Sequence, residues 1–176
     1  VLSEYGVSFP DFVAAFDPAR ELPYLPDVAS LEFDIARSGD AEDATPISNH
    51  DLLTLSAEQI ARSRLGLHPS LFLRSSKNPI VSIWLTNSFD AEVETLDASA
   101  AEDALIVRPF RSVEVHRLPA GGFHFMRALA DGHTLASAVP IAQAQEPHFD
   151  LAACARLLIS SGAIVALEPL LPAADH

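Results

Sequence analysis

Seven histidines and one cysteine are the side chains of this sequence best suited to metal binding or nucleophilic chemistry. A metal site needs several ligands held close together, and one helical signature of such a site is HExxH. The sequence contains no HExxH motif, and no pair of histidines comes with a matching carboxylate. We therefore expect no metal site in this chain. The histidines are His50, His68, His116, His124, His133, His148 and His176.

Nucleophilic catalysis has no better support in the sequence. Cys154 falls on the apolar side of a predicted helix that Asp150 caps, which favours a buried structural thiol over a nucleophile. The GxSxG, P-loop and Rossmann glycine patterns are absent from the sequence. We therefore expect a protein that is not an enzyme and that binds no cofactor.

Arginines are the next group that could recognise a ligand, because the guanidinium fork suits carboxylates of a peptide. Four of the five basic residues that follow position 103 are candidates for this role. The alternative is a solvated face with local ion pairs, which contribute little when exposed. The four candidates are Arg108, Arg111, Arg117 and Arg127.

A predicted β-hairpin offers a second way to bind a peptide. The segments ALIVRPF and SVEVHRL read as two short strands around a tight connection at residues 110–112. An exposed strand edge can accept an extra strand, with main-chain hydrogen bonds supplying much of the affinity. The alternative is that both strands are paired inside the sheet. The candidate peptide-binding residues are Val113, Glu114, Val115, His116 and Arg117.

The sequence leaves open which side of that strand, residues 113–118, faces outward. One possible outer set contains Val113, Val115 and Arg117. The other possible set consists of Ser112, Glu114, His116 and Leu118.

The net charge of the chain limits the classes of partner that it can bind. The formal net charge is −13, and residues 1–103 carry almost all of it, with 18 acidic and 6 basic residues. Such a chain repels phosphate backbones and anionic lipid, so we expect it to bind neither nucleic acid nor membranes. One cysteine cannot form an intramolecular disulfide, and no signal peptide opens the sequence, so we expect a cytoplasmic location.

Helical periodicity dominates the first half of the chain. We expect helices at residues 9–16, opened by a capping box at Ser8, at residues 26–37, and at residues 56–62, capped by Ser56 and Gln59. An acidic loop follows Arg37. Residues 65–74 alternate like one strand, in which Pro69 implies an edge or a bulge. Residues 79–84 read as a helix or as a strand.

The second half predicts a different order. Residues 89–103 look like an acidic linker or exposed edge, so we place a domain boundary near residue 101. The hairpin is followed by helices near residues 122–130, 135–145 and 151–160, with Pro140 expected to kink or break the second, and by a last strand. We therefore expect an α+β fold: a mainly helical region with a short strand segment (1–100) and a winged-helix-like module with a small antiparallel sheet (101–176).

Two long segments carry a resemblance to a known family. They are EYGVSFPDFVAAFDPARELPYLPDVASLEFDIA and RLGLHPSLFLRSSKNPIVSIW, and together they cover most of residues 4–85. The best-matched pieces are FPDF, LPYLPD, LHPS and the pair Ile83-Trp84. The chain resembles the HvfC/BufC family, formerly labelled a DNA-binding domain, whose members include MbnC-like proteins. Residues 104–170, with LADGHTLASAV, are similar to peptide-recognition elements of ribosomal-peptide biosynthesis.

The resemblance implies a role in peptide modification. Such proteins bind the leader of a ribosomally made precursor peptide and present it to a multinuclear iron-dependent oxidative enzyme that modifies cysteines, as in methanobactin biosynthesis. Iron is then expected in the partner enzyme only. The family also has an N-terminal helical region, and this sequence starts with Val1, so we expect it to be a piece of a longer protein.

The best-matched part of the first half also suggests where the enzyme docks. His68, Arg74 and Trp84 would form the docking surface, because Trp and Arg are common interface anchors. The alternative is a core in which Trp84 is packed and His68 bonds to the backbone. A DNA-binding regulator is the alternative function, although residues 135–145 contain no Lys or Arg.

Overall fold

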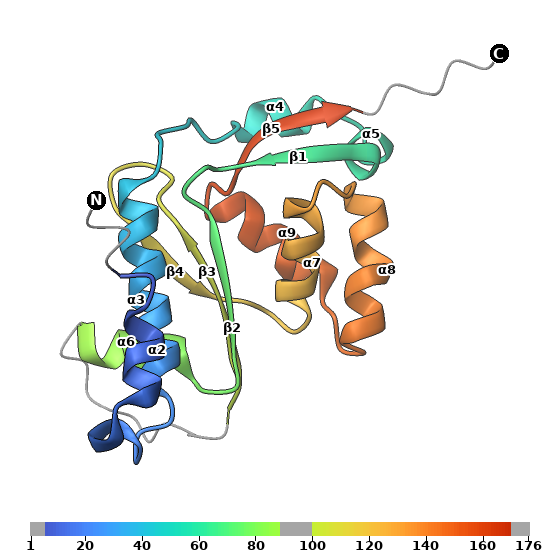
Figure 1. Ribbon diagram of the computed structural model, residues 1–176. Coiled ribbons are helices and arrows are strands. Elements are labelled where there is room, and N and C mark those ends of the chain that lie inside the picture. Colours follow the sequence, from blue (N-terminus) through green and yellow to red (C-terminus); the bar gives the residue numbers. More distant parts are fainter. Residues whose placement is uncertain (1–5, 89–99, 170–176) are drawn as a thin grey trace.

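Five strands form two small antiparallel sheets in the computed structural model, which describes residues 6–88 and 100–169 (Figure 1). The first sheet has the order β2–β3–β4, and the second pairs β1 with β5. Together with the helices around them, these sheets make a mixed α+β fold, as expected from the sequence. The strands are β1 (Ser63–Leu67), β2 (Phe72–Ser76), β3 (Glu102–Val107), β4 (Glu114–Arg117) and β5 (Ile164–Pro169).

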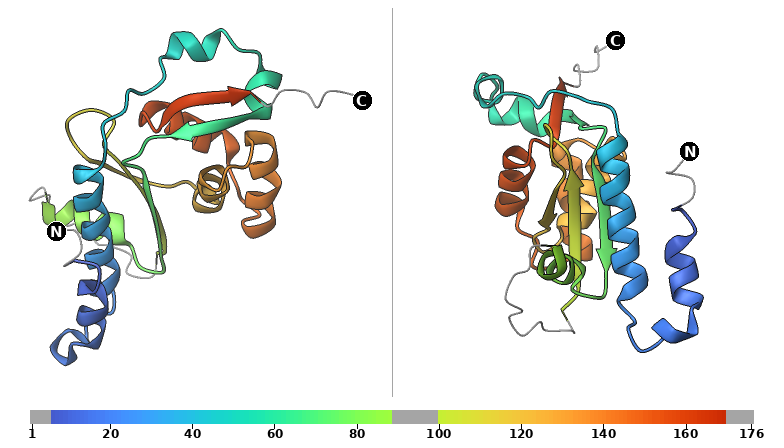
Figure 2. Two further views of the ribbon diagram at one scale, coloured as in Figure 1. Left: turned by 45° about the horizontal axis from the view of Figure 1, so that its top comes forward. Right: turned by 90° about the vertical axis from the view of Figure 1, so that its left-hand side faces the viewer.

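Helices cover both faces of the three-stranded sheet (Figure 2). Helices α3 and α6 lie against one face, and α7 lies against the other, with α8 and α9 beyond it. The helices are α2 (Phe9–Ala15), a 3-10 turn η1 (Asp17–Ala19), α3 (Leu25–Asp40), α4 (Asn49–Leu53), α5 (Ala57–Arg62), α6 (Ile80–Ser88), α7 (Gly122–Ala130), α8 (Leu135–Gln145) and α9 (Leu151–Ser160).

Strand β3 contributes to two hydrophobic cores because its side chains alternate between the faces of the sheet. Ala104 and Ile106 are buried in the α3-side core, which also contains Leu31, Ile80 and Val81. Leu105 points the other way, into the α7-side core. That core is built mainly from α7, α8, α9, β1 and β5, and its largest members include Phe125, Met126, Leu129 and Leu158.

Local capping signals fix three of the helix starts as predicted. Ser56 accepts a hydrogen bond from the Gln59 amide, and the Gln59 side chain accepts one from the Ser56 amide, so the capping box of α5 is confirmed. Asp150 caps α9 and Thr134 caps α8 in the same way. Helix α8 continues through Pro140, so of the two outcomes expected there, a kink or a break, the break does not occur. The capping box predicted for α2 is also wrong, because the Ser8 side chain makes no capping hydrogen bond.

The segment 65–74 is two strands and not the single strand that its alternation predicts. Strand β1 ends at Leu67, and β2 begins at Phe72. Between them the Leu71 amide donates to the His68 carbonyl, which closes a turn around Pro69. The alternation continues across this turn by coincidence, so periodicity could not reveal the break. For residues 79–84 the sequence allows a helix or a strand, and the structure has helix α6 there.

Helix α3 is longer than predicted and runs through Gly39 to Asp40, so part of the expected acidic loop is helical. The predicted linker lies partly outside the described residues, but its end does not behave as a linker. Glu102 is buried and opens β3, which corrects the expectation of an exposed segment up to residue 103. Strand pairs β2–β3 and β1–β5 both join residues from the two sides of position 101.

A buried ion pair connects α3 to β2. Asp34 on α3 is almost inaccessible. Its Oδ2 atom accepts a hydrogen bond from Arg74 Nε at 2.8 Å, and Arg74 Nη2 lies 2.5 Å from the same oxygen in an ion pair. Arg37 lies farther away, with Nη1 at 3.9 Å from Oδ1. Burial raises the pKa of Asp34, while the charge and hydrogen bond of Arg74 act in the opposite direction. The carboxylate therefore depends on Arg74 to stay charged.

Replacing Arg74 by leucine should lower the free energy of unfolding by roughly 3–5 kcal/mol at pH 7, because Asp34 keeps a buried charge without its partner. The folded-state pKa of Asp34 lies above its unfolded value. As the pH falls, the folded protein therefore protonates Asp34 before the unfolded chain does, and the cost of burying its charge decreases. The variant's loss of stability relative to the wild type should therefore shrink between pH 7 and pH 5. Urea unfolding at both values measures this difference. The double variant Asp34→Asn/Arg74→Leu is the control, and a penalty independent of pH would contradict the assignment.

Candidate functional site

Strand β4 is an outer strand of its sheet, and among the described residues it pairs with β3 alone. The Leu118 amide donates to the Asp103 carbonyl at 2.8 Å, which shows that the backbone groups of Leu118 face β3. In an antiparallel pair, the direction of these groups alternates from residue to residue. His116 and Glu114 therefore also direct their backbone groups toward β3. Those of Val115 and Arg117 point to the outer edge, as the peptide-binding hypothesis requires.

The side chains of β4 divide between the two faces of the sheet. Val113 and Val115 pack against the α3-side core, opposite Ile106. Glu114 and His116 lie on the other face, where Glu114 Oε2 is 3.1 Å from His116 Nε2. The outer edge of β4 thus has an apolar side and a polar side, and these could read alternate side chains of a bound strand.

Arg117 is tied to the protein itself. Glu102 is buried at the start of β3, and its Oε1 atom lies 3.2 Å from Arg117 Nε. The same carboxylate accepts hydrogen bonds from the Ser82 amide at 2.9 Å and from the Ser82 hydroxyl at 2.6 Å. Arg117 therefore anchors β4 to α6 and leaves its backbone, more than its charge, available to a ligand.

The other candidate arginines do not gather at β4. Arg108 donates to the carbonyl oxygens of Ser38 at 3.1 Å and Ala41 at 2.5 Å, and so holds the C-terminal end of α3. Arg111 is exposed in the connection between β3 and β4. Arg127 is on α7, against the opposite face of the sheet from α3, with its guanidinium 5.9 Å from the Phe123 ring centroid. The four arginines therefore form no common site.

His68, Arg74 and Trp84 are likewise separate, and each lines a different groove. His68 is buried, and its Nε2 atom lies 3.1 Å from the Ala44 carbonyl oxygen. Its Nδ1 atom accepts from the Ser70 amide at 3.1 Å, and the Ser70 hydroxyl lies 2.8 Å away. These bonds give His68 a structural role, as in the alternative in which it belongs to the core and bonds to the backbone. Arg74 is held by Asp34.

Trp84 does lie at a groove, between α2, α3 and α6, with a volume of about 480 Å³. An aromatic stripe begins at this groove: Phe9 lines it, and Phe12 and Phe16, the C-cap residue of α2, follow with stacked rings whose centroids are 6.4 and 5.6 Å apart. These three side chains are 52%, 59% and 47% exposed. The candidate residues taken from the sequence do not include these phenylalanines. The signal that could have found them is the helical spacing of Phe9 and Phe12 on a seven-residue helix that has Phe16 at its C-cap.

Cys154 has the properties of a structural thiol. It is buried in the α7-side core, and burial raises its pKa to about 11, with a smaller contribution from Asp150. The thiol is therefore protonated at neutral pH and a poor nucleophile. Within residues 6–88 and 100–169, no three His, Cys, Asp or Glu side chains come together in a way that could hold a metal ion.

Comparison with protein-family models gives no match for this chain, and a search of curated proteins gives none either. Among the helices in the described ranges, none combines the length and the apolar character that crossing a membrane requires.

Proposed function

We propose that this chain is a non-catalytic partner protein that binds the leader of a ribosomally made precursor peptide along β4. It then presents the peptide to a multinuclear iron-dependent oxidative enzyme for cysteine modification. The observation that carries the proposal is the position of β4 as an outer strand with Val115 and Arg117 directing backbone groups outward. The resemblance of residues 4–85 and 104–170 to HvfC/BufC proteins supports the identity of the partners.

Strand addition suits this edge physically. A leader segment lying beside β4 would exchange main-chain hydrogen bonds with Val115 and Arg117, which gives affinity with little dependence on sequence. Specificity would come from Val113 and Val115 on one side and from Glu114 and His116 on the other. In this proposal, residues 101–176 act as the winged-helix-like peptide-recognition module, and any iron belongs to the partner enzyme.

The enzyme would dock on the α2–α3–α6 groove. Aromatic side chains at a groove are typical anchors of protein interfaces. Phe9 and Trp84 line this groove, and the exposed Phe12 and Phe16 continue from Phe9 by ring stacking. Of the three docking residues expected from the sequence, Trp84 keeps this role in the proposal. His68 and Arg74 would support it indirectly, because their side chains bond inside the protein. A single buried cysteine fits the proposed cytoplasmic location.

Peptide capture by β4 can be tested with a pair of variants at one position. Arg117→Pro removes the outward N–H and should abolish co-purification of a Cys-containing precursor peptide with this protein, since proline cannot donate to an added strand. Arg117→Ala loses the same pairing with Glu102 but keeps the N–H, so it should retain the peptide. Equal retention by both variants would contradict strand addition on β4. Tight, salt-sensitive binding to duplex DNA would instead favour the regulator alternative.

Docking of the enzyme can be tested independently of the peptide. The double variant Phe12→Ser/Phe16→Ser should weaken association with the candidate iron enzyme by about 30-fold, because two aromatic anchors that contribute on the order of 1 kcal/mol each sum to about 2 kcal/mol. Peptide binding should be unchanged. Leu53→Ser on α4, where the side chain is 84% exposed, is the matched control. Calorimetric titrations with the enzyme and with the peptide measure the two affinities. If the Phe12→Ser/Phe16→Ser variant binds the enzyme as tightly as the wild type does, α2 is not part of the interface.

A further inference from the structure

The opposite edge of the same sheet has a separate groove. Strand β2 is the other outer strand, and the described residues pair it with β3 alone. The amide of Glu102 donates to the Asn78 carbonyl, so the even-numbered backbone groups of β3 face β2. The bonded pairs are then Phe72 with Ile106 and Arg74 with Ala104. Leu73 and Ser75, between them, direct their backbone groups to the free edge.

Helices wall this edge on both sides. Figure 1 shows β2 between α3 and α7, and a groove of about 350 Å³ runs there with Arg37 and Arg74 on one side and Arg127 and Ala130 on the other. A second groove, of about 330 Å³, lies along β1 and α7. The two grooves are adjacent, because Leu71 and Ala130 line both of them. We call the two together the β2 groove.

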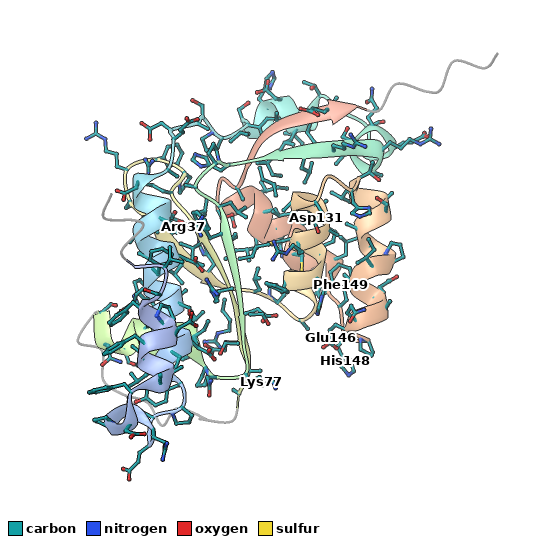
Figure 3. The ribbon with its side chains drawn as sticks, viewed as in Figure 1. Arg37, Lys77, Asp131, Glu146, His148 and Phe149 are labelled. Atoms are coloured by element: carbon teal, nitrogen blue, oxygen red, sulfur yellow. The ribbon has the colours of Figure 1, made fainter. Side chains whose placement is uncertain are left out.

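Positive charge gathers along the β2 groove although the chain as a whole is strongly acidic. The chain has eleven basic residues, and five of them line the groove or follow β2. Glu168 and the buried Asp34 are the carboxylates that line it. Figure 3 labels Arg37 on α3 and Lys77 at the end of β2. The five basic residues are Arg37, Arg64, Arg74, Lys77 and Arg127.

Two of these arginines keep donors for a ligand. Arg74 pairs with Asp34. The Arg37 side chain is 47% exposed, and it comes no closer than 3.9 Å to the same carboxylate. The Arg37 guanidinium lies 4.4 Å from the Phe72 ring centroid, which holds it over the α3 side of β2. Arg127 is exposed on the α7 side, and no carboxylate of the described residues lies within ion-pair distance of it.

We propose that the β2 groove binds an extended acidic peptide segment, which adds to the sheet as a strand beside β2. Side chains of an added strand alternate between the faces of the sheet, so neighbouring acidic residues would meet Arg37 on one side and Arg127 on the other. Leu73 and Ser75 would supply the main-chain hydrogen bonds. This site lies on the edge away from β4, and it stands whether or not β4 binds a leader.

Fluorescence anisotropy with a labelled synthetic peptide tests the proposal on the full chain. The probe has eight residues, with Glu-Glu pairs separated by Val-Thr pairs, and a second probe carries lysine in place of glutamate. The acidic probe should bind, weaken as salt is added, and bind at least 10-fold more tightly than the lysine probe. The variant Arg37→Glu/Arg127→Glu should lose binding by 10-fold or more. Arg20→Glu/Arg111→Glu makes the same charge change at exposed arginines that do not line the groove and should lose far less.

The strand geometry has its own test. Ser75→Pro removes an outward N–H of β2 and should abolish binding of the acidic probe, whereas Ser75→Ala should keep it. Arg117→Pro, which blocks the β4 edge, should leave the acidic probe bound, so failure at one edge is distinguishable from failure at the other. Equal binding of the two probes, equal losses in the two charge-reversal variants, or equal binding by the two Ser75 variants would each overturn the proposal.

Discussion

The burial of strand β3 on both faces is the constraint on which the rest of the structure depends. Ala104, Leu105, Ile106 and Val107 are completely inaccessible, and their side chains supply two cores in alternation. Strand β3 pairs with β2 along one side and with β4 along the other, so it is the inner strand of its sheet. Strands β2 and β4 are consequently the outer ones, and both proposed peptide sites follow from that position.

Each outer strand is attached to the protein by a buried carboxylate. Arg74 of β2 pairs with Asp34 on α3, and Arg117 of β4 pairs with Glu102, which also bonds to Ser82 on α6. Burying a carboxylate costs free energy that its partner has to offset, so neither arginine can leave for a ligand without a penalty. The backbone of β4 and the remaining arginines of the β2 groove are the groups available for recognition. The side chains that fix the outer strands to the protein are therefore different from the groups that can bind a ligand.

The features that sequence analysis predicted correctly rest on local interactions. The caps at Ser56, Thr134 and Asp150 satisfy amides within three residues. The strands of the β3–β4 hairpin pair as expected, although their connection spans residues 108–113 and not the tighter 110–112. Some errors are local, such as the capping box expected at Ser8, but the larger errors and omissions depend on contacts between distant residues. Strand β1 ends at Leu67 because it pairs with β5, about a hundred residues away, and Arg74 is positioned by Asp34 forty residues earlier. A single sequence contains no signal for such pairings, so the edge of β4 could be suggested but its outward residues could not be assigned.

Residue-resolved hydrogen exchange tests the peptide-binding role of β4 most directly. The amides of Val115 and Arg117 face away from β3, so they should exchange quickly in the free protein and slow by an order of magnitude or more when a Cys-containing precursor peptide is added. The amides of Glu114 and His116, which face β3, should be slow throughout. Slow exchange at Val115 and Arg117 without peptide, or exchange that the peptide leaves unchanged, would contradict the account.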